Sequence, residues 1–455
     1  MKLFGTDGIR GKFGESPINH DELVKIGHAF AKSLFGTKAG KILISNDGRE
    51  SSSAIEKALS LGIKHQGSMV FFIGLYPTPA LSIYLNSTAQ SSEMRAGIQI
   101  TASHNPYYDN GVKFFDNNGY KINSNFEETI ENNYFSYNEN IKEQYNQSLK
   151  ADDSDLFEKH YIDYIDDYFR SKMDNIHHSG DKFNILVDCA NGATSRIISK
   201  ILNNSFINLM PIFNEPNGKN INDNCGSVNI VKLSQKILNE KADIGFAFDG
   251  DGDRLIVVDD KGKEIDGDKI IALFAKNIIK TKKFKSKFPV VTTVMSNLGL
   301  ENFLLKKLGI KLKRSSVGDI NVIKEMQKFD SLLGGEQSGH LILSEFSKTG
   351  DGILAALKVT EIISQINKPS SVIFDLYNNF PQIKKNITYK KISKKNIMFI
   401  KKLNKKKFRD KNIRILIRLS GTEPLIRLLV EGKELNIVKH HARILENDIR
   451  KNLEQ

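Results

Sequence analysis

Three aspartates near the middle of the chain, Asp249, Asp251 and Asp253, are separated by single glycines. Apolar runs at 244–248 and 255–258 flank this segment and predict a strand, a tight loop and a second strand. In a straight strand the three carboxylates would share one face and repel one another, whereas glycines allow the loop to curl until they converge. Only a cation makes that convergence favourable, and ligation by anionic oxygens alone suits a hard ion such as Mg²⁺.

Two other interpretations of this loop fit its residues less well. An Asp-Gly-rich turn between two strands is common and needs no function. A calcium-binding EF-hand loop also begins Asp-x-Asp-x-Asp, but here Arg254 takes the place of its required glycine and Asp260 that of its bidentate glutamate. A three-carboxylate site that leaves coordination positions for phosphate or water favours magnesium in phosphoryl transfer.

A second polar loop, at 101–106, reads TASHNP. An apolar strand ends at Thr101 and Pro106 blocks its continuation, so we expect Ser103 on an exposed loop at the end of a strand. A simple turn serine is one interpretation, and the sequence around it lacks the Gly-x-Ser-x-Gly elbow of an α/β-hydrolase nucleophile. Next to a magnesium site, we expect Ser103 to carry phosphate, one oxygen of which could fill an open metal position.

Five separated motifs together resemble the α-D-phosphohexomutase family, and they occur in the family's order over nearly the whole chain. They lie at 4–11 (FGTDGIRG), 101–106 (TASHNP), 249–254 (DGDGDR), 335–340 (GEQSGH) and 418–424 (RLSGTEP). The forms of the second, fourth and fifth motifs resemble the glucosamine-specific branch. A mannose- or glucose-specific member of the same family is the alternative, and a sugar-phosphate phosphatase is a further one.

The organisation of the chain agrees with this resemblance. Apolar strand-like runs alternate with amphipathic helical stretches, which predicts α/β architecture with mixed or parallel sheets. After Lys368 the pattern changes to strands followed by a terminal helix. The family implies three similar α/β domains with mixed sheets and a smaller C-terminal α+β domain around a central cleft. We expect these domains at 1–153, 154–257, 258–368 and 369–455.

The resemblance implies an isomerase that interconverts glucosamine 6-phosphate and glucosamine 1-phosphate, on the route to UDP-N-acetylglucosamine and cell-wall precursors. Phosphorylated Ser103 would donate its phosphoryl group, and glucosamine 1,6-bisphosphate would be the activating intermediate. One Mg²⁺ would be held by Asp249, Asp251, Asp253 and an oxygen on Ser103.

The same motifs imply roles for further residues. Arg10 and Arg254 would neutralise the transferring phosphoryl group, since that transition state needs charge neutralisation more than covalent help. Lys113 and His340 are both candidates for the acid or base at the sugar hydroxyl, and the sequence leaves the choice open. The expected substrate-binding residues are Glu336 and Ser338 for the sugar, and Arg418, Ser420, Gly421, Thr422 and Arg427 for phosphate.

One position departs from the family pattern. Where the family commonly has Val-Gly-Asp-Arg, this chain has Val-Gly-Asp-Ile, with Ile320 in place of the arginine. A cation expected to line the third-domain loop is therefore missing, which puts a substrate contact by that loop in doubt.

Composition restricts partners and location. The net charge of +13 is concentrated in lysine-rich tracts at 280–287 and 384–411, yet no nucleic-acid recognition motif accompanies them. We therefore expect a small sugar phosphate as partner and no nucleic acid, and the absence of an apolar run of about 18 residues predicts no membrane partner. The two cysteines, Cys189 and Cys225, form no metal or disulfide pattern, which fits a reducing cytoplasm. A homodimer stays open.

Overall fold

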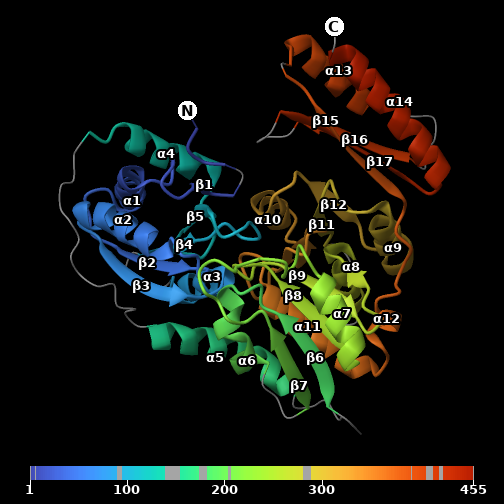
Figure 1. The fold of residues 1–455 in the computed structure, drawn as a ribbon, viewed down its shortest axis with the longest axis horizontal. Helices are drawn as coiled ribbons and strands as arrows, with labels where there is room; N and C mark the ends of the chain where they lie inside the picture. The colour runs from blue at the N-terminus through green and yellow to red at the C-terminus, as the bar shows by residue number, and fades with distance from the viewer. Residues whose placement is uncertain are drawn as a thin grey trace.

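Four β-sheets with their covering helices make up the molecule (Figure 1). The structure, a computed structural model, describes residues 2–5, 7–89, 95–138, 154–173, 182–202, 206–279, 288–390, 392–405, 413–419 and 424–453. None of the helices in these ranges is both long enough and apolar enough to cross a membrane. We refer below to the first unit (residues 2–138), the second (154–265), the third (267–377) and the fourth (382–453).

The first unit is a five-stranded mixed sheet with helices packed against it. In sheet order its strands are β1 (Ile9–Lys12), β5 (Asp109–Phe115), β4 (Arg95–Ile100), β2 (Lys41–Asn46) and β3 (Met69–Leu75), and its helices are α1 (His20–Phe35), α2 (Ser52–His65), α3 (Thr78–Thr88) and α4 (Ser124–Phe135). Asn19 begins α1 by accepting a hydrogen bond from the Glu22 amide, which satisfies one of the free amides of the first turn.

The second unit contains the aspartate loop between two strands that are buried along their whole length. In sheet order its strands are β10 (Glu264–Ile265), β9 (Leu255–Asp259), β8 (Ile244–Phe248), β6 (Phe183–Asp188) and β7 (Ile207–Ile212), and its helices are α5 (Ser154–Met173), the 3₁₀ helix η1 (Ala193–Arg196), α6 (Ile198–Ile201) and α7 (Val231–Glu240). The strand, tight loop and strand expected around the three aspartates are confirmed.

The third unit has a smaller sheet of four strands. In sheet order these are β12 (Leu312–Ser315), β11 (Val290–Thr293), β13 (Leu333–Gly335) and β14 (Leu341–Leu343), and the helices are α8 (Gly267–Ile278), α9 (Leu298–Leu308), α10 (Asp319–Lys328), α11 (Gly352–Ile366) and α12 (Ser370–Ile373). Capping carboxylates begin two of these helices: Asp266 accepts from the Lys269 amide and Asp351 from the Leu354 amide.

The first three units repeat one topology. In each, two strands pair in parallel, a third strand pairs in parallel with the first of them, and a fourth strand pairs antiparallel with the third. The hairpins that join third and fourth strands are therefore equivalent: β4–β5, β8–β9 and β13–β14. The expected similarity of the three α/β domains is confirmed by this shared strand order, which the sequence did not reveal as a repeat.

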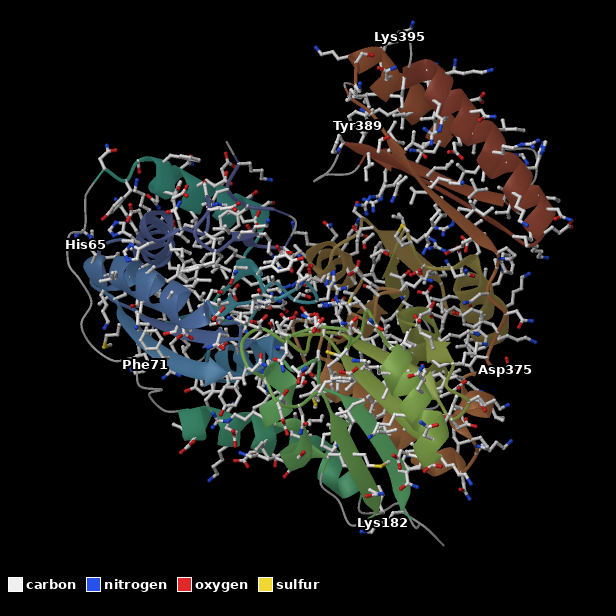
Figure 2. The ribbon with its side chains drawn as sticks, in the orientation of Figure 1. His65, Phe71, Lys182, Asp375, Tyr389 and Lys395 are labelled. Atoms are coloured by element: carbon white, nitrogen blue, oxygen red, sulfur yellow. The ribbon has the colours of Figure 1, made fainter. Side chains whose placement is uncertain are left out.

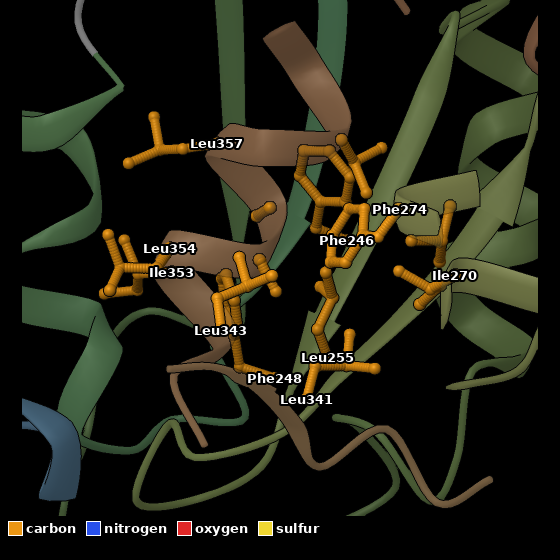
Figure 3. Close-up of a cluster of buried hydrophobic side chains, with 14 of the residues drawn as sticks. Phe246, Phe248, Leu255, Ile270, Phe274, Leu341, Leu343, Ile353, Leu354 and Leu357 are labelled. Carbon is orange, nitrogen blue, oxygen red and sulfur yellow. The ribbon is translucent and has the colours of Figure 1, made fainter. Parts of the chain in front are cut away.

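A continuous hydrophobic core joins these three units. Figure 3 shows its centre, where Phe246 of β8 and Leu255 of β9 lie between side chains of α8 and α11. Both faces of this part of the sheet are covered, which is why β8 and β9 are apolar at every position that faces a helix. The aspartate loop is thus anchored on two of the most deeply buried strands of the molecule.

The fourth unit is smaller and stands at one end of the molecule (Figure 1). Its antiparallel sheet has the order β15 (Gln382–Thr388), β17 (Leu425–Gly432) and β16 (Ile413–Leu419), and its helices are α13 (Lys394–Lys405) and α14 (Leu435–Leu453). Lys395 lies at the end of this unit that points away from the rest of the chain (Figure 2). The expected α+β character of the C-terminal domain is confirmed.

Two of the expected domain boundaries differ from the divisions between the sheets. The boundary after residue 257 falls inside β9, because that strand continues to Asp259 and turns back through β10 to Ile265. The boundary after residue 368 falls before α12, whose Ile373 and neighbouring Phe374 belong to the shared core. Residues 139–153, which contain the first boundary, lie outside the described part of the chain.

Candidate active site

The three equivalent hairpin loops carry the serine, aspartate and GEQSGH motifs, and they meet. Ser103 in the β4–β5 loop donates a hydrogen bond from Oγ to Asp249 Oδ2 at 2.6 Å. The β8–β9 loop pairs with the β13–β14 loop through an isolated bridge between Arg254 and His340. One topology, used three times, therefore brings the phosphoserine candidate, the metal candidate and the sugar candidate to a single place.

The aspartate triad has the geometry of a metal site. Asp249, Asp251 and Asp253 are buried, and one carboxylate oxygen of each lies within 4.8 Å of those of the other two. Asp251 Oδ1 is buried and accepts no hydrogen bond from the residues that the structure describes. A buried carboxylate oxygen without a donor is costly unless a cation faces it. This oxygen-only donor set fits a hard divalent ion such as Mg²⁺.

Both glycines of the triad loop are required by its shape. A Cβ on Gly250 would lie 2.7 Å from the carbonyl oxygen of Ser103, so only glycine lets the two loops approach this closely. Gly252 has a φ of +70°, and a Cβ there would also lie 2.7 Å from Thr194 Cγ2. The alternation of aspartate and glycine thus reflects both loop curvature and contact with the serine loop.

Burial and neighbouring charges shift the pKa values of two triad carboxylates in opposite directions. Burial raises the pKa of Asp249 well above its usual value, and the carboxylates of Asp253 and Asp251 add to this effect. Burial would also raise the pKa of Asp253, but Lys113 and His340 outweigh it and hold that pKa well below its usual value. Lys113 and His340 thus stabilise the charged form of Asp253, whereas a further cation would be needed to stabilise the charged form of Asp249.

Ser103 is buried, so the expectation that it lies on an exposed loop is wrong: only 2% of the residue is exposed. The aspartate loop of the second unit covers it, a contact between units that the local pattern could not predict. Ser103 adopts a left-handed backbone conformation with φ of 53°, which is uncommon for a residue with a side chain and recurs at functional sites.

Arg49 and Asn222 support the serine loop, and the sequence analysis assigned neither of them. The buried Arg49 guanidinium donates to the carbonyl oxygens of Asn105 at 3.0 Å and of Asp109 at 2.8 Å. Asn222 donates to the carbonyl oxygen of Ser103 at 2.9 Å. The one available signal was a polar Asp-Gly-Arg loop directly after β2, which places Arg49 at the same sheet edge as the serine loop.

Lys113 lies in the site and is not a surface lysine. Its Nζ is 2.7 Å from Asp251 Oδ2, 2.9 Å from Asp253 Oδ2 and 3.6 Å from Asp7 Oδ2, with 1% of the side chain exposed. Burial acts to lower the pKa of Lys113, but these three carboxylates outweigh it and raise that pKa well above the usual value. The charged ammonium therefore sits beside the triad.

The two arginines expected at the phosphoryl group occupy different places. Arg254 Nε lies 3.8 Å from Asp249 Oδ2 and 3.9 Å from Asp253 Oδ1, directly at the triad. Arg10 is bound to Asp7, with Nη2 2.7 Å from Oδ2, and reaches the triad through the shared contact of Asp7 with Lys113. Both guanidiniums remain partly exposed, at 21% and 29% of the side chain.

His340 is enclosed between two carboxylates. Its Nδ1 lies 3.5 Å from Asp253 Oδ1 and its Nε2 lies 3.6 Å from Asp319 Oδ2. The Gly350 amide also donates to Nε2 at 3.1 Å. Burial opposes the charged imidazolium, but Asp253 outweighs it and Asp319 adds to the effect, so the pKa of His340 is raised.

The sugar-loop residues face the same region with different exposure. Glu336 is buried, accepts a hydrogen bond from the Gly318 amide at 3.1 Å and acts electrostatically on Arg254. Ser338 is exposed. A carboxylate fixed at one oxygen and a hydroxyl open to solvent are suited to binding sugar hydroxyls.

The phosphate candidates of the fourth unit form one cationic pair. Arg418 and Arg427 lie directly opposite each other on β16 and β17. Burial and the neighbouring Arg427 both lower the pKa of Arg418, and two guanidinium groups side by side suit a phosphate group. Ser420, Gly421 and Thr422 lie outside the described residues.

Ile320 does not face the triad region. It lines a cavity of about 270 Å³ between the first and third units, together with Leu34, Phe126 and Ile323. An apolar side chain at the position where the family commonly has arginine therefore belongs to the contact between two units. The replacement of the family's arginine by Ile320 therefore affects this contact, which we call the seam between the first and third units.

Comparison with known proteins places this geometry in a family. Models of the phosphoglucomutase/phosphomannomutase α/β/α domains I, II and III match residues 1–141, 159–262 and 266–380, and the C-terminal domain model matches 375–444. A phosphoglucosamine mutase of Nautilia profundicola is 42% identical over 441 residues, covering 96% of this chain and 97% of that protein. A phosphoglucosamine mutase of Histophilus somni is 38% identical over 455 residues, covering 99% of each.

A solved structure supports the fold as a whole. A phosphoglucomutase/phosphomannomutase family protein from Burkholderia thailandensis superposes with a TM-score of 0.79 at 23% identity, covering 98% of this chain and 97% of that one. All four domain models occur in order, and the full-length relatives exceed the identity at which a shared family is secure. The chain therefore belongs to the phosphoglucomutase/phosphomannomutase family, the α-D-phosphohexomutases.

Proposed function

We propose that this chain is a phosphoglucosamine mutase, an isomerase that interconverts glucosamine 6-phosphate and glucosamine 1-phosphate. The observation that carries the proposal is the hydrogen bond from Ser103 Oγ to Asp249 Oδ2, which supports a phosphoryl carrier at Ser103 acting beside a metal ion held by the triad. The choice of glucosamine follows from the full-length similarity to proteins of that name.

Phosphoryl transfer begins with phosphate on Ser103. The bond from phosphorus to Ser103 Oγ breaks as a bond forms to the free hydroxyl oxygen of the bound sugar phosphate, which yields the 1,6-bisphosphate. The hydroxyl proton passes to the neutral form of His340 or Lys113, the two candidate acid–base groups beside the triad, whichever is deprotonated when the substrate is bound. The bisphosphate then reorients, its other phosphoryl group returns to Ser103 Oγ, and the proton returns to the oxygen left behind.

The remaining residues neutralise charge and hold the substrate. Arg254 places a cation beside the transferring group, whose metaphosphate-like transition state spreads charge over three oxygens, and the Lys113 ammonium adds a second cation where His340 takes the proton. Asp249, Asp251 and Asp253 would hold one Mg²⁺, which supplies Lewis-acid charge neutralisation at the phosphoryl oxygens.

Substrate binding draws on two units. Glu336 and Ser338 bind the sugar, while Arg418 and Arg427, with the 420–422 segment, bind the phosphate that is not reacting. Because the two ends of the bisphosphate carry the same group, one phosphate site serves both halves of the reaction. The free, buried state of Cys189 and Cys225 agrees with a cytoplasmic enzyme.

The test compares glucosamine, mannose and glucose 6-phosphates, each with its own 1,6-bisphosphate and Mg²⁺, by ³¹P NMR of the 6- and 1-phosphate signals. We expect glucosamine 6-phosphate to give the highest kcat/KM. Preference for a neutral sugar would reassign the chain to phosphomannomutase or phosphoglucomutase activity. Steady release of inorganic phosphate at the rate of substrate loss would show that the chain is a phosphatase and not a mutase.

A further inference from the structure

Six side chains from three units form a closed ring in which acidic and basic groups alternate. Four of its contacts involve Lys113 or His340 and are given above, with distances between 2.9 and 3.6 Å. The ring is completed by Lys121, whose Nζ lies 2.8 Å from Asp7 Oδ1 and also contacts Asp319 Oδ2. In order the members are Asp253, Lys113, Asp7, Lys121, Asp319 and His340.

Three of the six ring members, Asp7, Lys121 and Asp319, received no role from the sequence motifs. Among the described residues, Asp7 pairs with Lys113, Asp319 pairs with His340, and Lys121 pairs with both of these carboxylates, whereas none of the three forms an ion pair with the metal triad. Lys121 and Asp319 are nearly enclosed, with 5% and 8% of their side chains exposed. Charges this buried are tolerated only when each has its partner in place.

We propose that Asp7, Lys121 and Asp319 are positioning residues that hold the two proton-transfer candidates, Lys113 and His340, at the reacting group. The proposal rests on the mutase function proposed above. Asp7 fixes the Lys113 ammonium from the first unit, and Asp319 fixes the His340 ring from the third. Lys121 joins the two carboxylates, so the positions of the acid–base groups depend on each other.

Lys121 is the link at which the ring crosses from the first unit to the third. It follows β5 in the first unit, whereas Asp319 begins α10 in the third. The adjoining seam opens into the cavity that Lys121 itself lines, together with apolar side chains such as Ile320 and with the charged side chains of Asp116 and Lys324. Without the lysine, the buried carboxylate of Asp319 and the partly exposed carboxylate of Asp7 would face each other across the seam and repel each other.

The first experiment replaces Lys121 by methionine, which keeps the length of the side chain and removes the charge. We expect kcat for glucosamine 6-phosphate to fall by about 30-fold while KM changes by less than about threefold, because a positioning contact acts in the transition state. Lys358→Met is the matched control: Lys358 pairs with Glu361 at 2.9 Å, has 10% of its side chain exposed against 5% for Lys121, and lies in α11 outside the ring. It should lose thermal stability and keep its kcat.

A double variant separates positioning from stability. In Lys121→Met/Asp319→Asn the unpaired carboxylate is gone, so the Tm should recover toward the wild-type value. The kcat should stay low, because His340 now lacks the Asp319 carboxylate that faces its Nε2, although Asp253 remains at Nδ1. If kcat recovered together with the Tm, the ring would only hold the fold together and the positioning role would be refuted. A rise in KM at unchanged kcat in either variant would instead make Lys121 a substrate ligand and refute it as well.

A measurement without substrate keeps this proposal distinct from the proposed function. Hydrogen–deuterium exchange should be faster in peptides containing His340 and Lys113 in Lys121→Met, and unchanged there in Lys358→Met. Unchanged exchange at both sites in Lys121→Met would refute the ring as a positioning device. If the wild-type protein had no mutase activity, only the proposed function would be contradicted, because the hydrogen–deuterium exchange result does not depend on turnover.

Discussion

Lys113 Nζ lies 2.7 Å from Asp251 Oδ2, although the two residues come from different units and are 138 positions apart in the chain. Both side chains are almost completely buried. The contact joins the hairpin that carries the phosphoryl acceptor to the hairpin that carries the metal triad. Because Ser103 Oγ also donates to Asp249 Oδ2, the proposed phosphoryl carrier and the Lys113 ammonium are both held at the same cluster of carboxylates.

The phosphoryl carrier gives the most direct test. Intact-protein mass spectrometry should show a fraction of the protein about 80 Da heavier, as expected for added phosphate, and peptide mapping should place it on Ser103. Ser103→Ala should lose at least about 1000-fold in kcat, because no other group of the site replaces the covalent acceptor. Ser136→Ala, at an exposed serine after α4, is the control and should keep full activity. Phosphate mapped to another residue, with activity retained in Ser103→Ala, would contradict the assignment.

The triad predicts metal dependence that can be read without catalysis. Asp251→Asn removes the carboxylate whose buried Oδ1 has no donor among the described residues. In the wild type, Mg²⁺ should raise the Tm, because it binds the folded protein, and EDTA should abolish both this rise and the activity. Asp251→Asn should show neither, whereas Asp223→Asn, at an exposed residue of the same unit, should behave as wild type. A normal Mg²⁺-dependent rise in Tm for Asp251→Asn would exclude that residue as a ligand.

The phosphate pair of the fourth unit predicts a change in affinity more than in rate. Arg418→Met should raise KM for the sugar phosphate by about 10- to 100-fold, because one charge-assisted phosphate contact is lost while the triad is untouched. Arg443→Met, at an exposed arginine of α14, should leave KM unchanged. A fall in kcat at constant KM in Arg418→Met would mean that the arginine acts on the transferring group.

The sequence predicted those parts of the site that lie within single motifs. The aspartate triad, its flanking strands and the order of domains could be read from local pattern, because apolar runs and glycine spacing report on local structure. The burial of Ser103 and the ring through Asp7, Lys121 and Asp319 could not be predicted. They depend on contacts between units that are far apart in the chain, and an isolated aspartate or lysine in a charged sequence carries no signal of its distant partner.

The strand order that the first three units share could not be predicted from the sequence either. The three hairpins share a topology, but they carry a serine, three aspartates and a glutamate–histidine pair, which have no common residue pattern. Backbone topology is set by apolar periodicity, which many sequences satisfy, whereas each loop is fixed by its own chemistry. Similarity of fold without similarity of sequence is therefore the expected result at these three places.

The last prediction concerns stability and pH through Glu56, a buried residue of α2 that accepts a hydrogen bond from Asn46 at 2.8 Å. Burial raises the pKa of Glu56 to about 7, and the Asn46 hydrogen bond offsets only part of this effect. Between pH 4.5 and 7 the unfolded chain has released the proton that the folded protein keeps, so stability falls as the pH rises through this window. Glu56→Gln should remove this fall and stabilise the protein at pH 8 by up to about 3 kcal/mol, with little change at pH 4. Urea unfolding midpoints at the two pH values measure this difference, with the exposed Glu240→Gln as control. Equal midpoint shifts for Glu56→Gln at both pH values would show that folding does not raise the pKa of Glu56.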